Sequence, residues 1–266
     1  MIPKIIHYCW FGGNELPELA IKCLNSWKKH CKGYKIIEWN ENNFDISKAP
    51  LYVRQAYEAK KWAFVSDYVR LWALVNHGGV YMDTDVQVVK PLDKFLVCNA
   101  FSGFEDDIHI STGIMGCEKD FPLFVEFLDY YNDALFLNSD GSFNTVTNVI
   151  IMTKICSGIG LEQNNKFQVI DGFALYPKDY FCPIDYSTGL LNKTNNTVTI
   201  HWFSGSWLDE SQKKEEEKRR EEAKRQYLLA KREKRRNYMV HFPNIILNKA
   251  LGDNRYERLK KIIKKK

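Results

Sequence analysis

The stretch that decides the fold is residues 62–86, WAFVSDYVRLWALVNHGGVYMDTDV. Apolar residues recur at helical spacing between Phe64 and Val75, which predicts a helix with a buried face. Gly78-Gly79 is expected to end that helix, because glycine accepts the positive φ found at helix C-termini. The apolar residues 80–82 then predict a short strand. This stretch therefore indicates a helix, a tight turn and a strand in succession.

Two carboxylates, Asp83 and Asp85, follow the strand with one residue between them. Hard oxygen ligands of this kind bind Mn²⁺ or Mg²⁺ together with phosphate oxygens and water. Because Asp-x-Asp is common in exposed loops, the context indicates the metal site and the pair alone does not. Part of that context is Asp67 and Arg70, one turn apart on the predicted helix, where their side chains can meet. The alternative for these two is an ion pair on a helix surface.

The segment resembles the DXD sugar-binding core of glycosyltransferases, specifically glycosyltransferase family 32, which is related to the catalytic domain of the large clostridial glucosylating toxins. The resemblance extends to an opening stretch, IPKIIHYCWFG at residues 2–12, and to a closing stretch, HWFSGSW at residues 201–207. Over residues 1–208 it implies a GT-A-like fold. It also implies a metal-dependent, retaining transfer of a sugar from a nucleotide-sugar donor, in bacterial surface polysaccharide synthesis.

The resemblance also implies roles for individual residues. Asp85 is expected to bind the divalent metal directly, and Asp83 to orient the ribose, the sugar or a metal-bound water. His201 would complete the metal sphere as a neutral imidazole. Asp67 and Arg70 would hold the donor sugar through its hydroxyl or phosphate groups.

Three aromatic residues are candidates for contact with the donor. Trp10 ends the first strand before two glycines, and the resemblance favours stacking on the nucleobase. Tyr8 alternates with the core face of that strand and is the weaker candidate. Tyr81 lies on the strand before Asp83 and faces either the core or the donor.

The closing stretch resembles a lid over the donor. Ser206 would contact the metal or a phosphate, Trp207 would donate its indole N–H to the β-phosphate, and Gly205 would act as the hinge. The spacing names no general base. Asp106-Asp107, ahead of Ser111-Thr112-Gly113, either line the acceptor side or form a plain acidic loop.

Outside these motifs, the sequence alternates between predicted strands and helices, which favours an α/β fold with a mostly parallel sheet and helices on both faces. Ligands of such sheets bind at the carboxyl ends of the strands. The expected strands are 2–9, 34–39, 80–82, 86–91, two within 99–117, 167–170 and 197–201. Besides the helix that contains Asp67, the expected helices are 17–30, 51–59, 121–137 and 144–157.

The 266 residues suit one catalytic domain, 1–208, followed by a charged and amphipathic helical tail, 209–266. No run of about 20 apolar residues and no signal peptide is apparent. The seven scattered cysteines form no CxxC pair and indicate reduced thiols. We therefore expect a cytoplasmic protein, either free or peripheral on the inner face of the cell membrane.

The charge is distributed unevenly along the chain. Residues 209–266 contain 20 Lys/Arg and 10 Asp/Glu, whereas residues 1–208 contain 18 and 23. We expect a solvated helix over 209–236, an end to it at Phe242-Pro243, and then a Lys-rich amphipathic segment, 242–266, that binds an anionic membrane surface. The alternative is that its apolar residues pack back on the domain. The acidic domain offers no basic groove for nucleic acid.

Two classes of function remain open from the sequence. The first is the metal-dependent glycosyltransferase, with a UDP- or GDP-linked sugar as donor and a saccharide or lipid-linked saccharide as acceptor. The second is a non-catalytic sugar-binding or tethering module that acts through its basic C-terminal helices. The intact set of acidic, basic and aromatic residues in all three motifs favours the enzyme.

Overall fold

The computed structural model describes residues 1–205 and 210–251, and of residues 210 and 236–251 it describes the backbone only. These residues divide into two compact units. One consists of 1–186 and 190–213, and the other consists of 187–189 and the residues from 214 onward. The domain boundary at 208/209 stays a prediction.

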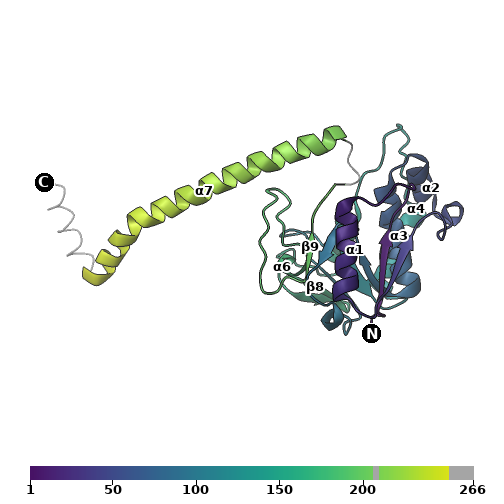
Figure 1. The fold of residues 1–266 in the computed structure, drawn as a ribbon, viewed down its shortest axis with the longest axis horizontal. Coiled ribbons are helices and arrows are strands. Elements are labelled where there is room, and N and C mark those ends of the chain that lie inside the picture. The colour runs from purple at the N-terminus through teal and green to yellow at the C-terminus, as the bar shows by residue number, and fades with distance from the viewer. Residues whose placement is uncertain (206–209, 252–266) are drawn as a thin grey trace. The chain divides into compact units, whose positions relative to one another are not determined.

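The first unit is built on a seven-stranded sheet with the strand order β2-β1-β3-β6-β5-β8-β7. Figure 1 shows the helices of this unit packed around the sheet. Five strands point in one direction, and β6 and β7 run antiparallel to their neighbours. The predicted α/β fold with a mostly parallel sheet is therefore confirmed. The strands are β1 (Ile5–Cys9), β2 (Lys35–Trp39), β3 (Gly79–Met82), β5 (Ala100–Gly103), β6 (Ile114–Cys117), β7 (Gln168–Ile170) and β8 (Phe173–Tyr176).

Helices cover both faces of this sheet, and each face has its own buried cluster. The residues of β3 show the division, because Tyr81 enters one cluster while Val80 and Met82 enter the other. The helices α2 (Leu51–Glu58), α3 (Trp62–His77), α4 (Pro122–Asp133) and α5 (Asn148–Gly158) contribute to the first cluster. The helices α1 (Glu18–His30) and α6 (Lys178–Phe181) contribute to the second.

The turn from α3 into β3 follows the sequence prediction. Gly78 has φ 64° and its N–H donates to the carbonyl of Leu74 at 2.8 Å, which closes the helix. Gly79 has φ 109°, and a Cβ there would lie 2.7 Å from the carbonyl oxygen of Ile5. Only glycine permits β3 to approach β1 this closely.

Two predicted strands pair with each other outside the main sheet. These are β4 (Val86–Val88) and β9 (Thr199–His201), which form an antiparallel pair with Val86 opposite His201. This pairing brings the end of the catalytic region back to the residues that follow β3. The sequence reading placed no separate elements at β8 and α6.

The helix α7 (Glu210–Leu251) corrects the predicted end at Phe242-Pro243, because the helix continues through both residues. Proline removes one backbone hydrogen bond, but its φ is compatible with a helix. A long helix retains its other backbone hydrogen bonds and can therefore continue through the proline. Side chains over 211–235 are mostly exposed, and Glu216 pairs with Arg219 and Arg220 at 2.7 and 3.2 Å. Residues 252–266, most of the predicted membrane-binding segment, lie outside the described residues. Within the described chain, no helix has the length and apolar character needed to cross a membrane.

Candidate active site

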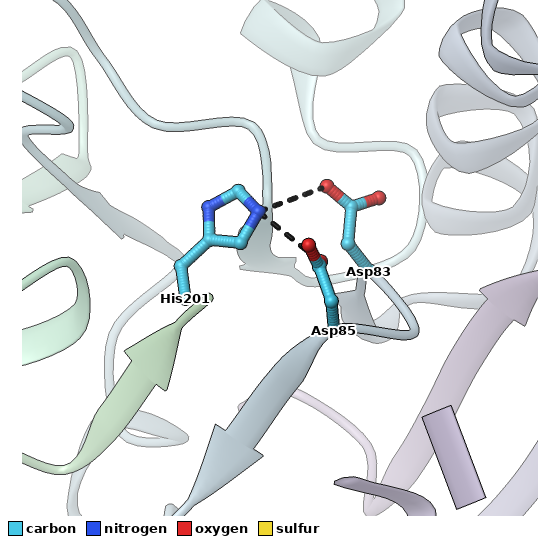
Figure 2. Close-up of side chains that lie close together, drawn as sticks. All are labelled: Asp83, Asp85 and His201. Atoms are coloured by element: carbon cyan, nitrogen blue, oxygen red, sulfur yellow. Dashed lines mark ion pairs between the residues drawn. The ribbon is translucent and has the colours of Figure 1, made fainter. Parts of the chain in front are cut away.

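Three residues predicted to bind metal meet at one end of the sheet (Figure 2). Asp83 directly follows β3, Asp85 directly precedes β4, and His201 is the last residue of β9. His201 Nε2 lies 3.2 Å from Asp85 Oδ1 and 4.0 Å from Asp83 Oδ2. One ligand atom from each residue lies within 4.8 Å of the other two. The structure thus brings together side chains that are distant in sequence.

A tight turn presents the two carboxylates. The N–H of Val86 donates to the carbonyl of Asp83 at 2.9 Å, which closes a four-residue turn. The N–H of Asp83 donates to the carbonyl of Gly113 at 2.8 Å, and the carbonyl of Asp85 accepts from the N–H of Trp202 at 3.1 Å. The backbone of both aspartates is therefore fixed from each side.

Of the two carboxylates, that of Asp85 is held by more hydrogen bonds. Its Oδ2 accepts from the N–H and the hydroxyl of Ser204 at 2.8 and 2.9 Å, while its Oδ1 faces His201. Burial disfavours the charged form, but the His201 charge and these hydrogen bonds outweigh it and hold the pKa of Asp85 well below its usual range. Burial likewise disfavours the charged imidazole, but Asp85 raises the pKa of His201 well above its usual value. In the metal-free chain, His201 and Asp85 therefore form an ion pair.

The donor set fits a small divalent cation. Two carboxylate oxygens and an imidazole nitrogen are ligands that Mn²⁺ accepts, and the carboxylates alone suit Mg²⁺. Gly113 leaves room for this arrangement. A Cβ at that position would lie 2.8 Å from both Nδ1 and Cε1 of His201 and 3.3 Å from Asp83 Oδ2. A bound cation would take the place of the proton on His201.

Arg70 joins α3 to the end of β3. Its side chain is 7% exposed and that of Asp67 is 10% exposed, so the alternative of a surface ion pair is excluded. One guanidinium nitrogen, NH2, lies 3.2 Å from Asp67 Oδ1 and 3.3 Å from Asp83 Oδ1. The other, NH1, donates to the carbonyl and hydroxyl of Thr112 at 3.0 and 3.1 Å, and Nε donates to the carbonyl of Ser66 at 3.2 Å.

These contacts engage each nitrogen of the guanidinium with protein acceptors. The geometry therefore favours Arg70 as a residue that positions Asp83, in place of the predicted direct hold on the donor sugar. Asp67 is also held by protein, since the N–H of Asn148 at the start of α5 donates to its Oδ2 at 3.4 Å. Burial, opposed by Arg70, raises the pKa of Asp67 to about 6. Contact of Asp67 with the donor stays a prediction.

The structure resolves the open choice for Tyr81. Its ring is buried in the core with the Arg70 guanidinium carbon 4.8 Å from the ring centroid, and its hydroxyl donates to Asp83 Oδ1 at 2.9 Å. Tyr81 therefore faces the core and reaches the site only through its hydroxyl, which corrects the option of a ring facing the donor.

The other two aromatic candidates lie on β1 and just beyond it. Tyr8 is buried on the opposite face of the sheet, packs its ring against Trp27 and donates its hydroxyl to Glu38. The predicted donor contact of Tyr8 is thus not what the structure favours, because the strand alternation turns the ring into the core. Trp10 is half-buried, and its indole N–H donates to the carbonyl of Asn14 at 2.6 Å. Stacking of Trp10 on a nucleobase stays a prediction.

The predicted lid lies only partly within the described chain. Gly205 has φ 60°, a conformation that favours glycine, and the ring of Phe203 lies 4.1 Å from that of His201. Ser206 and Trp207 lie outside the described residues. Their contacts with phosphate or metal stay predictions.

The acidic loop after β5 distinguishes between the two alternatives for Asp106 and Asp107. Asp106 accepts from the N–H groups of Ile108 and His109 at 2.8 and 2.7 Å and pairs with the His109 ring. Asp107 is 77% exposed and pairs with Lys178 at 2.7 Å. These contacts favour the plain-loop alternative, because both carboxylates are engaged by residues of the protein.

The sequence reading missed Glu105, the first of the three consecutive acids. Burial, together with the charges of Asp106 and Asp83, raises the pKa of Glu105 to about 7, against the opposing effect of His201. A run of three acids after a strand gives no signal of which side chain turns inward. The available clue was that Glu105 lies two residues beyond β5, whose carboxyl end lies on the same side of the sheet as that of β3.

Comparison with known proteins supports a glycosyltransferase independently of the site geometry. Residues 17–102 match the glycosyltransferase sugar-binding region containing the DXD motif. This region includes Asp67, Arg70, Asp83 and Asp85, whereas His201 lies beyond it. The matched segment is thus the part of the chain that forms α1 to β4 and enters β5.

Several curated proteins are similar to the chain. An uncharacterised glycosyltransferase of Acanthamoeba polyphaga mimivirus is 26% identical over 215 residues, which cover 73% of this chain and 82% of that protein. Inositol phosphoceramide mannosyltransferase 3 of Schizosaccharomyces pombe is 30% identical over 129 residues, covering 47% of this chain and 36% of that protein. A mannosyl phosphorylinositol ceramide synthase of Saccharomyces cerevisiae is 29% identical over 136 residues, covering 48% and 34%. The chain matches about a third of the length of these yeast proteins.

Two solved structures are also similar. The PaToxG glycosyltransferase aligns at a TM-score of 0.44 with 18% identity, covering 60% of this chain and 72% of that one. A glycosyltransferase involved in the glycosylation of the major capsid of PBCV-1 aligns at 0.44 with 12% identity, covering 81% and 100%. At these scores neither likeness supports an argument. The matched region and the curated relatives support a glycosyltransferase.

Proposed function

We propose that the protein is a metal-dependent, retaining glycosyltransferase of family 32 with a GT-A-like fold. It moves a sugar from a nucleotide-sugar donor to a saccharide acceptor in surface polysaccharide synthesis. The observation that supports this most strongly is the convergence of Asp83, Asp85 and His201 at the end of β3, beside a glycine that leaves room for the His201 ring. Retention follows from the family resemblance.

Asp85 and His201 would hold the cation, with Asp83 as the third ligand or as the residue that orients a bound water. When bound, a divalent cation neutralises the charge that develops on the diphosphate leaving group. Ser204 fixes Asp85 through two hydrogen bonds, and Arg70 and Tyr81 fix Asp83. This preorganisation lets the ligands keep their places as the donor bond breaks. The imidazole favours Mn²⁺ over Mg²⁺.

The donor is proposed to be a UDP- or GDP-linked hexose. The name of the Schizosaccharomyces pombe relative, an inositol phosphoceramide mannosyltransferase, supports hexose transfer. Trp10 would contact the nucleobase, and Ser206 and Trp207 would contact the diphosphate. The acceptor is proposed to be a lipid-linked saccharide, with residues 242–266 on the anionic inner face of the cell membrane.

The experiment is a panel of UDP-glucose, UDP-galactose, UDP-N-acetylglucosamine and GDP-mannose, with release of the nucleoside diphosphate as the signal. Each donor is incubated with p-nitrophenyl glycosides in Mn²⁺, in Mg²⁺ and in EDTA. We expect one donor to be consumed with Mn²⁺ and to be stable in EDTA. A protein that binds a nucleotide sugar but consumes none of the panel would support the tethering module instead.

A further inference from the structure

The loop after β5 is built to fix one side chain. Phe104 pairs with Ile110, and the N–H of Glu105 donates to the carbonyl of His109 at 2.8 Å, so residues 105–109 close on themselves. Asp106 holds the loop from within through the N–H groups of Ile108 and His109. Asp107 points outward, is 77% exposed and pairs with Lys178, an exposed ion pair that contributes little to the loop. The carboxylates of Asp106 and Asp107 thus have protein partners. Glu105 is the third acid of this loop and is the one whose carboxylate could contact a ligand at the candidate site.

The Glu105 carboxylate lies beside the candidate metal site without belonging to it. It is half-buried and within electrostatic reach of Asp83 and His201. It is not part of the group whose ligand atoms lie within 4.8 Å of one another. Among the residues that the structure describes, no side chain or backbone N–H donates a hydrogen bond to this carboxylate. A half-buried acid without a protein donor has a hydrogen-bonding capacity that a ligand can meet.

The strand order indicates which substrate would lie nearest to Glu105. β1, β3 and β5 point in the same direction, so their carboxyl ends lie at one edge of the sheet, with β3 between the other two. Under the proposed function, the nucleobase lies near Trp10 beyond β1 and the diphosphate lies at the metal site beyond β3. Continuing in the same direction along the sheet, the acceptor hydroxyl that attacks the donor sugar would then bind near the end of β5, close to Glu105.

We propose that Glu105 binds the saccharide acceptor by accepting a hydrogen bond from one of its hydroxyls. This inference rests on the proposed function and adds a residue for the acceptor side. Glu105 is then a substrate-binding residue and not a ligand of the cation. Its removal should impair transfer to a saccharide more than transfer to water.

The test compares Glu105→Gln and Glu105→Ala with the matched control Asp107→Asn, which alters an exposed acid of the same loop. For each protein, the donor consumed in the panel above is supplied with Mn²⁺, first without acceptor and then with the p-nitrophenyl glycoside that stimulates the wild type most. Hydrolysis reports transfer to water, and the glycoside product reports transfer to the saccharide. Mn²⁺ affinity is measured by titration calorimetry on the same samples.

We expect Glu105→Ala, which removes the acceptor, to raise the KM for the glycoside at least about tenfold. Glu105→Gln keeps an acceptor oxygen without the charge, so it should raise the KM by a smaller factor. Hydrolysis and Mn²⁺ affinity should stay within about threefold of the wild type, as should every property of Asp107→Asn. An unchanged KM in the Glu105 variants overturns the inference, and so does an equal loss of hydrolysis or of Mn²⁺ affinity. A wild type that consumes no donor overturns the proposed function itself, whereas a wild type that hydrolyses a donor but gains nothing from any glycoside overturns only the inference about Glu105.

Discussion

Gly113→Ala tests whether the metal site depends on the space that this glycine leaves. The backbone of Gly113 lies outside the left-handed region, so alanine introduces a methyl group and no strain in φ. That methyl would lie 2.8 Å from Nδ1 and Cε1 of His201, closer than real Cβ contacts allow. The imidazole must retreat by several tenths of an ångström, and metal ligands tolerate displacements of only about 0.2 to 0.5 Å. We expect Mn²⁺ affinity to fall by about 10- to 100-fold, which corresponds to roughly 1.4 to 2.8 kcal/mol.

The assay is Mn²⁺ binding by titration calorimetry, with the melting temperature measured on the same sample. The control is Gly158→Ala, because Gly158 also lies outside the left-handed region and a Cβ there would have nothing within 4 Å. We expect that variant to bind Mn²⁺ like the wild type. If Gly113→Ala binds Mn²⁺ within threefold of the wild type while remaining folded, the reasoning about His201 is wrong.

Two further predictions concern the Arg70 contacts and the tail. Arg70→Met should lower the free energy of unfolding by about 3 to 5 kcal/mol in urea denaturation, because it leaves the buried Asp67 and the half-buried Asp83 without their cation. Adding Asp67→Asn should recover part of that loss, and a loss below about 1 kcal/mol in the single variant would contradict the role assigned to Arg70. The full chain should sediment with phosphatidylglycerol vesicles at low salt, whereas a chain ending at residue 241 should not, because basic residues near such a surface each contribute about 1 kcal/mol. Equal sedimentation of the two chains would exclude the membrane role.

Local sequence patterns predicted the segments in which neighbours along the chain decide the structure. The helical period before Gly78-Gly79 and the apolar run after it gave α3, its end and β3 in the right places. Both glycines also proved necessary for steric reasons, since a Cβ at Gly79 would meet Ile5 of β1 and a Cβ at Gly78 would meet the backbone of Lys119 and the ring of Pro3. Asp83, Asp85 and His201 were also named as one site, through the resemblance and not through spacing.

The remaining features depend on contacts that a sequence pattern does not contain. The pairing of β4 with β9 sets His201 beside Asp85, and no local signal specifies that pairing. The engagement of Arg70 by Thr112, and the half-buried position of Glu105 near Asp83 and His201, depend on contacts between segments that are distant in sequence. The continuation of α7 through Pro243 shows that a helix breaker is a tendency and not a rule.

The central claim is that a divalent cation held by Asp85 is required for sugar transfer. The most direct measurement is donor turnover by the wild type and by Asp85→Ala, each with Mn²⁺ and with EDTA. The account predicts that EDTA abolishes wild-type turnover and that Mn²⁺ restores it. It also predicts that folded Asp85→Ala is at least about a hundredfold slower, equivalent to roughly 3 kcal/mol in the transition state. Full turnover in EDTA, or an Asp85→Ala protein within threefold of the wild type, would contradict it.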